Sequence, residues 1–217
     1  MSGKPILFNT EMVRAILEGQ KTCTRRVIKP QPDGNCTYPL GFVTDSTEKK
    51  EVGCFGFSID EYGGSIKYVK PPYQPGDTLY VRETWKKAPN GYYYYEDWQR
   101  NDIADITKWH PSIHMPKEAA RIWLKVTDVR VERLQDITEE QACMEGTDPW
   151  DEVCYENNGW HPTFSDPDSG GDPNMVDGFH KLWNSTIKKS DLDRYGWNAN
   201  PWIWVIEFER CNNQESE

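Results

Sequence analysis

The chain has 217 residues and a formal net charge of -10 at pH 7, which is enough length for one large domain or two small ones. The negative charge argues against binding along duplex DNA, because duplex affinity grows with the phosphates that lysine and arginine neutralise, but it permits a local basic pocket for one nucleotide or a short single strand. No apolar run approaches the roughly 18 residues of a membrane helix and the N-terminus has no apolar signal segment, so we expect a cytoplasmic protein without a membrane partner.

The first element that the sequence predicts is a helix over residues 10–19. Its apolar residues recur on one helical face: Met12, Val13, Ile16 and Leu17. Thr10 is the predicted N-cap and Gly19 the stop. The stretch "KTCTRRVIKP" that follows predicts a short strand. It gathers two lysines and two arginines around Thr22 and Thr24, and in an acidic chain this cluster is either an ordinary solvated edge or a site.

Three later stretches alternate as strands do. "GDTLYVRETW" (76–85) follows the turn residues "YQPGD". "RIWLKVTDVRVERL" (121–134) alternates and then resumes out of phase, which predicts a β-bulge near Thr127 and Asp128. "WIWVIEFER" (202–210) alternates throughout, and we expect a strand with one buried face.

Two further helices are predicted between and after these strands. In "DITEEQACMEG" (136–146), Thr138 and Gln141 form a capping-box pattern and Gly146 is a natural stop. "MVDGFHKLWNSTI" (175–187) has a helical pattern that Gly178 interrupts.

Long stretches rich in Gly, Pro, Asn and Asp separate these elements, at roughly 31–72, 86–116 and 147–173. They read as loops, with short hairpins as an option. Short strands with two or three helices and no regular βαβ alternation predict an α+β fold, namely a small β-barrel that carries insertions. We expect a single domain over residues 1–217.

The order of these motifs resembles the ASCH domain, a β-barrel family similar to the RNA-binding PUA domains. The motifs are "G-x-K-T-x-T-x-R" after a helix, "PGD-x-L-x-V", a long strand, "L-x-x-I-T-E-E-x-A-x-x-E-G" and a final "W-x-I-x-F" strand. Residues 109–138 also resemble an ASCH subfamily common in bacteriophage and prophage genomes. The resemblance covers about half of the chain and implies a PUA-like barrel with two or three flanking helices and long loop insertions.

Some small bacterial ASCH proteins are amidohydrolases that remove the acetyl group from N4-acetylcytidine. Their catalytic set is a lysine and a threonine of the "K-T-x-T" strand and a glutamate at the end of the following helix. The matching positions here are Lys21, Thr24 and Glu145. The resemblance therefore implies recognition of a modified nucleoside, nucleotide or single-stranded RNA, with hydrolysis of an N-acyl group and no cofactor. The alternatives are a non-catalytic RNA-binding module and a phage accessory protein that binds a host protein.

The chemistry of these three residues leaves structural alternatives open. Lys21 is a base for the Thr24 hydroxyl only as a neutral amine, and only if it lies in the turn after Gly19, because residues three apart in a flat strand face opposite ways. Otherwise it is a phosphate- or carbonyl-binding lysine beside a structural threonine. Glu145 lies at the predicted helix C-terminus, where the helix dipole disfavours a carboxylate. Its alternative is an exposed, frayed helix end.

Five further residues are expected to bind the substrate: Thr22, Arg25, Arg26, Trp85 and His114. The cations would receive an anionic or carbonyl-rich ligand, and the aromatic side chain would form a wall. A metal site is not expected. Pro111 prevents the helix that would align His110 with His114, and the cysteines lack the spacing of a zinc site.

Overall fold

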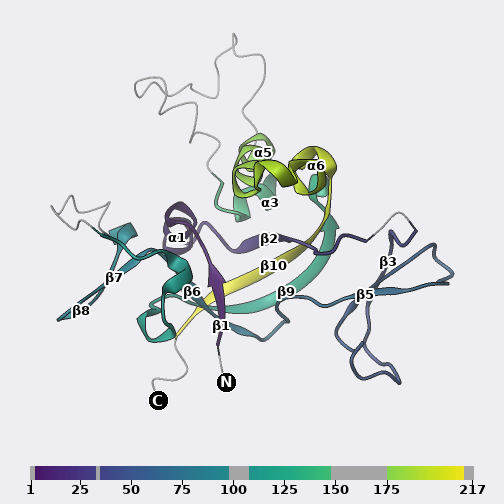
Figure 1. The fold of residues 1–217 in the computed structure, drawn as a ribbon, viewed down its shortest axis with the longest axis horizontal. Coiled ribbons are helices and arrows are strands. Elements are labelled where there is room, and N and C mark those ends of the chain that lie inside the picture. The colour runs from purple at the N-terminus through teal and green to yellow at the C-terminus, as the bar shows by residue number, and fades with distance from the viewer. Residues whose placement is uncertain (1–2, 33–34, 98–107, 148–174, 213–217) are drawn as a thin grey trace, which may run out of the picture.

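The computed structural model describes residues 3–32, 35–97, 108–147 and 175–212 and has an α+β fold (Figure 1). Its centre is a five-stranded sheet with the strand order β1-β6-β9-β10-β2. These strands are β1 (Lys4–Leu7), β2 (Cys23–Val27), β6 (Thr78–Arg82), β9 (Trp123–Arg133) and β10 (Trp202–Cys211). Strand β1 pairs with β6 in parallel, and the other neighbours are antiparallel.

The described strands do not close into the barrel that we expected. The sheet is open, with β1 at one edge and β2 at the other. The two edges nevertheless approach each other, since the guanidinium of Arg26 in β2 donates a hydrogen bond to the carbonyl of Leu7 in β1, at 3.0 Å. The twist of the long β9–β10 pair explains this curl, because strand twist and a bulge both bend a sheet. The gap between the edges is therefore spanned by side chains rather than by backbone hydrogen bonds.

The bulge predicted near Thr127 and Asp128 is confirmed. Glu207 of β10 pairs with Asp128, and the next residue, Phe208, pairs with Val126, so Thr127 has no opposite residue. An out-of-phase apolar pattern is enough to locate such an extra residue, because side chains alternate strictly between the two faces.

Strand β10 is buried on both faces, not on the single face that we expected. Trp204 and Ile206 are buried on one face, but Ile203 and Val205 are fully buried on the other. The second face is covered because helices pack against it. Ile203 and Val205 belong to a cluster with Phe179 of α5 (Met175–Thr186).

Helix α1 (Thr10–Leu17) begins one residue earlier than the sequence predicted. Its N-cap is Asn9, whose side-chain oxygen accepts a hydrogen bond from the backbone N–H of Met12, at 2.8 Å, so Thr10 is the first helical residue. The predicted stop is confirmed, because Gly19 has a φ of +78°, a left-handed conformation that favours glycine.

The second predicted helix, α3 (Glu139–Met144), has the expected capping box. The Thr138 hydroxyl accepts from the backbone of Gln141, and the Gln141 side chain accepts from the backbone of Thr138. The third predicted helix is α5, which runs through Gly178 without a break. Helices α3, α5 and α6 (Leu192–Tyr195) gather on one side of the sheet, next to β2 (Figure 1).

The first two expected loops contain strands. Residues 31–72 include a three-stranded sheet of β3 (Tyr38–Phe42), β4 (Phe55–Ser58) and β5 (Lys67–Val69), and β7 (Trp85–Ala88) and β8 (Gly91–Tyr94) form a hairpin. The 3-10 helices are η1 (Ser112–His114), η2 (Lys117–Ala119), η3 (Leu134–Asp136), η4 (Lys189–Asp191) and η5 (Trp197–Ala199). Phe57 of β4 packs edge-on against Trp202, which joins the small sheet to the main core.

The third expected loop, apart from its first residue, lies outside the described residues. Among those described, no helix combines the length and the apolar character needed to cross a membrane.

Candidate functional site

Lys21 lies in the turn that joins α1 to β2. The backbone N–H groups of Gln20 and Lys21 both donate to the carbonyl of Ala15, at 2.9 and 3.0 Å, so the chain folds back over the end of α1. The next residue, Thr22, donates its N–H to the carbonyl of Met144, at 2.9 Å. These bonds attach the start of β2 to the C-terminus of α3 and turn the Lys21 side chain inward, where the residue is 2% exposed.

Glu145 receives that side chain. The Lys21 ammonium donates to the Glu145 carboxylate, with Nζ 2.6 Å from Oε2, and to the Glu145 backbone carbonyl at 2.8 Å. Glu145 is the C-cap of α3 and is only 3% exposed, so it is not the frayed helix end of the structural alternative. The cation compensates for the unfavourable end of the helix dipole.

Gly146 makes this close approach possible. A Cβ atom at this position would lie 2.6 Å from the Cβ of Ala15 and 3.0 Å from the Cβ of Lys21. Both distances are too short for carbon atoms in contact, and the φ of +71° also favours glycine. The glycine that ends α3 therefore also lets α1 and the Lys21 turn pack against Glu145.

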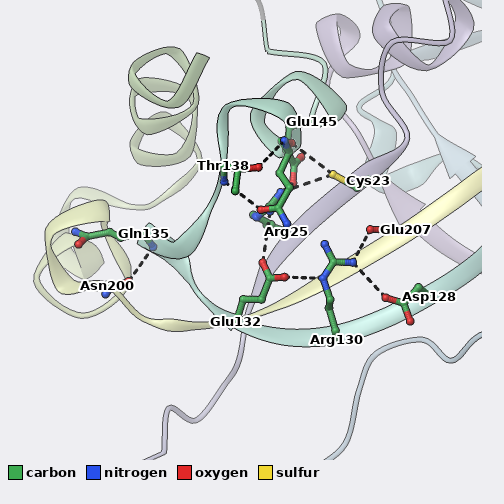
Figure 2. Close-up of polar contacts among 11 residues, drawn as sticks. Cys23, Arg25, Asp128, Arg130, Glu132, Gln135, Thr138, Glu145, Asn200 and Glu207 are labelled. Atoms are coloured by element: carbon green, nitrogen blue, oxygen red, sulfur yellow. Dashed lines mark hydrogen bonds and ion pairs between the residues drawn. The ribbon is translucent and has the colours of Figure 1, made fainter. Parts of the chain in front are cut away.

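Arg25 binds the other side of the same carboxylate. Its Nη1 donates to Glu145 Oε1 at 3.1 Å (Figure 2), and its Nη2 donates to the side-chain oxygen of Gln141 at 2.9 Å. A further ion pair joins Nη2 to Glu132 Oε2, at 3.6 Å. Each oxygen of Glu145 thus contacts one cation, and the carboxylate is fixed in position.

A row of charges continues from this point along β9. Arg130 contacts Glu132 at 2.5 Å, Glu207 of the neighbouring strand at 2.5 Å and Asp128 at 3.2 Å (Figure 2). Burial alone would lower the pKa of Arg130, but the hydrogen bonds that it donates to the carboxylates outweigh this effect and raise that pKa above its ordinary value. Glu132 therefore links Arg25 to a permanently charged partner.

Cys23 is the thiol nearest to this cluster. Burial, reinforced by the negative charge of Glu145, raises the pKa of Cys23 from 9.0 to about 12. The Arg25 Nη1 lies 3.6 Å from its sulfur. A thiol with this pKa stays protonated near neutrality and is a poor nucleophile. The hydroxyl of Thr24 is then the better nucleophile candidate in β2.

A shallow pocket lies against this cluster, between α1, β2 and α5, and its empty volume of about 290 Å³ includes space that is open to solvent. Its lining residues are Met12, Thr24, Arg25, Arg26, Glu145, Phe179, Leu182, Trp183 and Thr186. Thr24 and Glu145 therefore share one pocket. Lys21 does not line it, and reaches the pocket through its contact with Glu145.

Three residues that we expected to bind substrate lie outside this lining. Thr22 contributes backbone hydrogen bonds to Met144 and Phe208. Trp85, the first residue of β7, is buried in a separate cluster, with its ring tilted against that of His110. His114 is exposed on η1. Among the expected substrate-binding residues, Arg25 and Arg26 line the pocket.

Other residues of the site were not anticipated from the sequence. Helix α5 supplies the apolar wall of Phe179, Leu182 and Trp183, and Gln141 and Glu132 hold Arg25. The capping box located Gln141 but did not show that its amide oxygen also accepts from an arginine. Nothing in the pattern of α5 says which strand its apolar face covers.

The described part of the chain contains no group of three or more His, Cys, Asp or Glu residues placed to hold a metal ion. Comparison with known protein families, curated proteins and solved structures finds no significant match. The function must therefore be argued from the geometry of the site.

Proposed function

We propose that the chain is an ASCH-type amidohydrolase that removes the acyl group from an N-acylated cytidine nucleoside or nucleotide. The observation that carries the proposal is the contact between Lys21 and Glu145 beside the pocket that Thr24 lines. The resemblance singled out these three residues from two distant segments of the sequence. The curled sheet, whose edges Arg26 bridges, supports a relationship to PUA-like barrels but is more open than a closed barrel.

The geometry favours a particular division of roles. The Lys21 nitrogen donates to both the carboxylate and the backbone carbonyl of Glu145, and Lys21 does not line the pocket. Glu145 is the group of the pair that lines the pocket. We therefore assign the proton transfer to Glu145 and assign to Lys21 the role of holding that carboxylate in position.

The proposed reaction proceeds in two stages. The Thr24 oxygen attacks the acyl carbon while its proton passes to Glu145, and the C–N bond then breaks as that proton moves to the leaving amine. Water next attacks the threonine ester, with Glu145 again taking a proton. This step releases the carboxylic acid and restores the Thr24 hydroxyl.

The direct test is to incubate the full-length protein with N4-acetylcytidine and to measure acetate and cytidine. The proposal expects equal amounts of both products, and a much slower release of both with the Thr24→Ala variant. Wild-type protein that binds the nucleoside in this pocket but releases no acetate would support the non-catalytic binding module instead.

A further inference from the structure

The lining of the pocket is basic, although the chain as a whole is acidic. It carries the guanidinium groups of Arg25 and Arg26 and a single carboxylate, that of Glu145. Lys21 contacts this carboxylate from behind. In a chain of net charge -10, a concave site of the opposite sign concentrates anions at one place on the surface.

Arg26 is the pocket cation whose charge is least compensated. Within the part of the chain that the structure describes, it forms no ion pair, whereas Arg25, Arg121 and Arg130 each contact at least one carboxylate. Arg26 lies across the ring of Phe8, 5.4 Å from its centre, and gives one hydrogen bond to the carbonyl of Leu7. A guanidinium has five N–H donors, so most of its donors are left for another group.

Arg25 also has a hydrogen-bond donor that the described part of the chain leaves unpaired. Its Nε is buried, and no hydrogen-bond partner for it exists among the described residues, although Nη1 and Nη2 are both engaged. The large majority of buried side-chain polar atoms in proteins have a hydrogen-bond partner, so an unpaired one calls for a ligand or a water molecule. The residue is 3% exposed and lines the same pocket as Arg26.

We propose that Arg25 and Arg26 form an anion subsite and that the pocket takes a nucleoside 5'-monophosphate in preference to a free nucleoside. The planar fork of arginine matches a phosphate through two parallel hydrogen bonds, and a phosphate monoester can accept from both residues at once. The nucleoside part of this inference rests on the proposed function, whereas the anion subsite rests on the two arginines alone.

Two further observations fit this ligand. Burial lowers the pKa of Arg26, which means that its charge is costly where it lies and is stabilised by an incoming anion. Met12 of α1 and Leu182 of α5 line the pocket beside the arginines and offer apolar surface to a base or acyl group. The small pocket and the acidic chain favour one nucleotide over a long RNA strand.

The experiment compares binding of CMP, cytidine and inorganic phosphate to the full-length protein by calorimetry at low salt. CMP is expected to bind at least about 10-fold more tightly than cytidine, and inorganic phosphate to compete with CMP. Arg26→Gln should reduce CMP affinity about 10-fold or more and reduce cytidine affinity much less. Arg26→Lys keeps the charge but loses the planar fork, so its CMP affinity should lie between those of the wild type and Arg26→Gln.

Arg210→Gln is the matched control. Arg210 is exposed, lies outside the pocket lining and, like Arg26, donates one hydrogen bond to a backbone carbonyl, that of Leu17 at 3.2 Å. The Arg210→Gln substitution removes the same charge as Arg26→Gln and should leave CMP affinity unchanged. Equal losses in Arg26→Gln and Arg210→Gln would overturn the subsite, as would CMP binding no tighter than cytidine.

The outcomes separate this inference from the proposed function. CMP binding that depends on Arg26, without any acetate release, would sustain the subsite and reject the amidohydrolase. Acetate release from N4-acetylcytidine, together with no gain in affinity from a 5'-phosphate, would sustain the amidohydrolase and reject the subsite. A cytidine oligonucleotide that binds far more tightly than CMP would overturn the assignment to a single nucleotide.

Discussion

The ammonium of Lys21 lies 2.6 Å from the carboxylate of Glu145, although the two residues are 124 positions apart in the sequence. Both side chains are buried. The contact joins the turn before β2 to the end of α3, and the same carboxylate is held on its other side by Arg25. It is therefore both a link between two layers of the fold and the polar centre of the candidate site.

The first prediction concerns the contribution of this ion pair to stability. Lys21→Met should lower the free energy of unfolding by about 3–5 kcal/mol, because it leaves a buried carboxylate with one fewer cation. Urea denaturation followed by circular dichroism measures this. Lys4→Met is the control, because the Lys4–Asp77 pair is partly exposed and should contribute no more than about 1 kcal/mol. Equal losses in the two variants would contradict the structural role of Lys21.

The second prediction separates two reasons for glycine at position 146. Gly146→Ala and Gly19→Ala both place a side chain at a positive φ, but nothing lies within 4 Å of a Cβ at Gly19. The Gly19 variant should lose about 1–2 kcal/mol from backbone strain alone. The Gly146 variant should lose about 1–3 kcal/mol more, because its Cβ meets Ala15 and Lys21. Equal shifts of the denaturation midpoint in the two variants would show that the packing around Gly146 is looser than the structure has it.

The third prediction concerns stability in alkali. The pKa of Cys23 is about 12 in the folded protein and 9.0 as an ordinary thiol, so between these values the folded state binds the proton that the unfolded state has lost. Stability from this group is complete below pH 9.0 and falls as the pH rises towards about 12. Cys23→Ala should therefore lose less stability than the wild type over this range. Parallel stability profiles for the two proteins would argue against the raised pKa.

The same thiol predicts a selective chemical modification. At pH 8, iodoacetamide should label the exposed Cys143 in the folded protein and leave Cys23 unmodified, because only the accessible thiolate reacts. Peptide mass spectrometry of the labelled protein measures this. Rapid labelling of Cys23 under native conditions would show that β2 opens readily at this position.

The fifth prediction concerns catalysis and rests on the proposed function. Thr24→Ala and Glu145→Gln should each lower the rate of acetate release by about 10²–10⁴. The double variant should be scarcely slower than the slower single variant, because the two groups act in one step. Thr24→Ser keeps the hydroxyl and should retain part of the activity. Full activity in Glu145→Gln would leave an enzyme but reject this mechanism.

Much of the local structure of this protein could be predicted from the sequence. The capping box of Thr138, the glycine stop at Gly19 and the bulge at Thr127 all follow from residues close together in the chain. The N-cap of α1 was displaced by one residue, because Asn9 and Thr10 are both good caps and the sequence does not rank them.

Only the tertiary structure decided what each element packs against. The two buried faces of β10, the open edges of the sheet and the apolar wall that α5 supplies to the pocket depend on which segments meet. The resemblance named Lys21, Thr24 and Glu145, but nothing in the alternation of β2 showed that Arg25 would contact Glu145 from the opposite side of Lys21. Capping and periodicity are set within a few residues of the chain, whereas a buried charge finds its partner only when distant segments exclude water together.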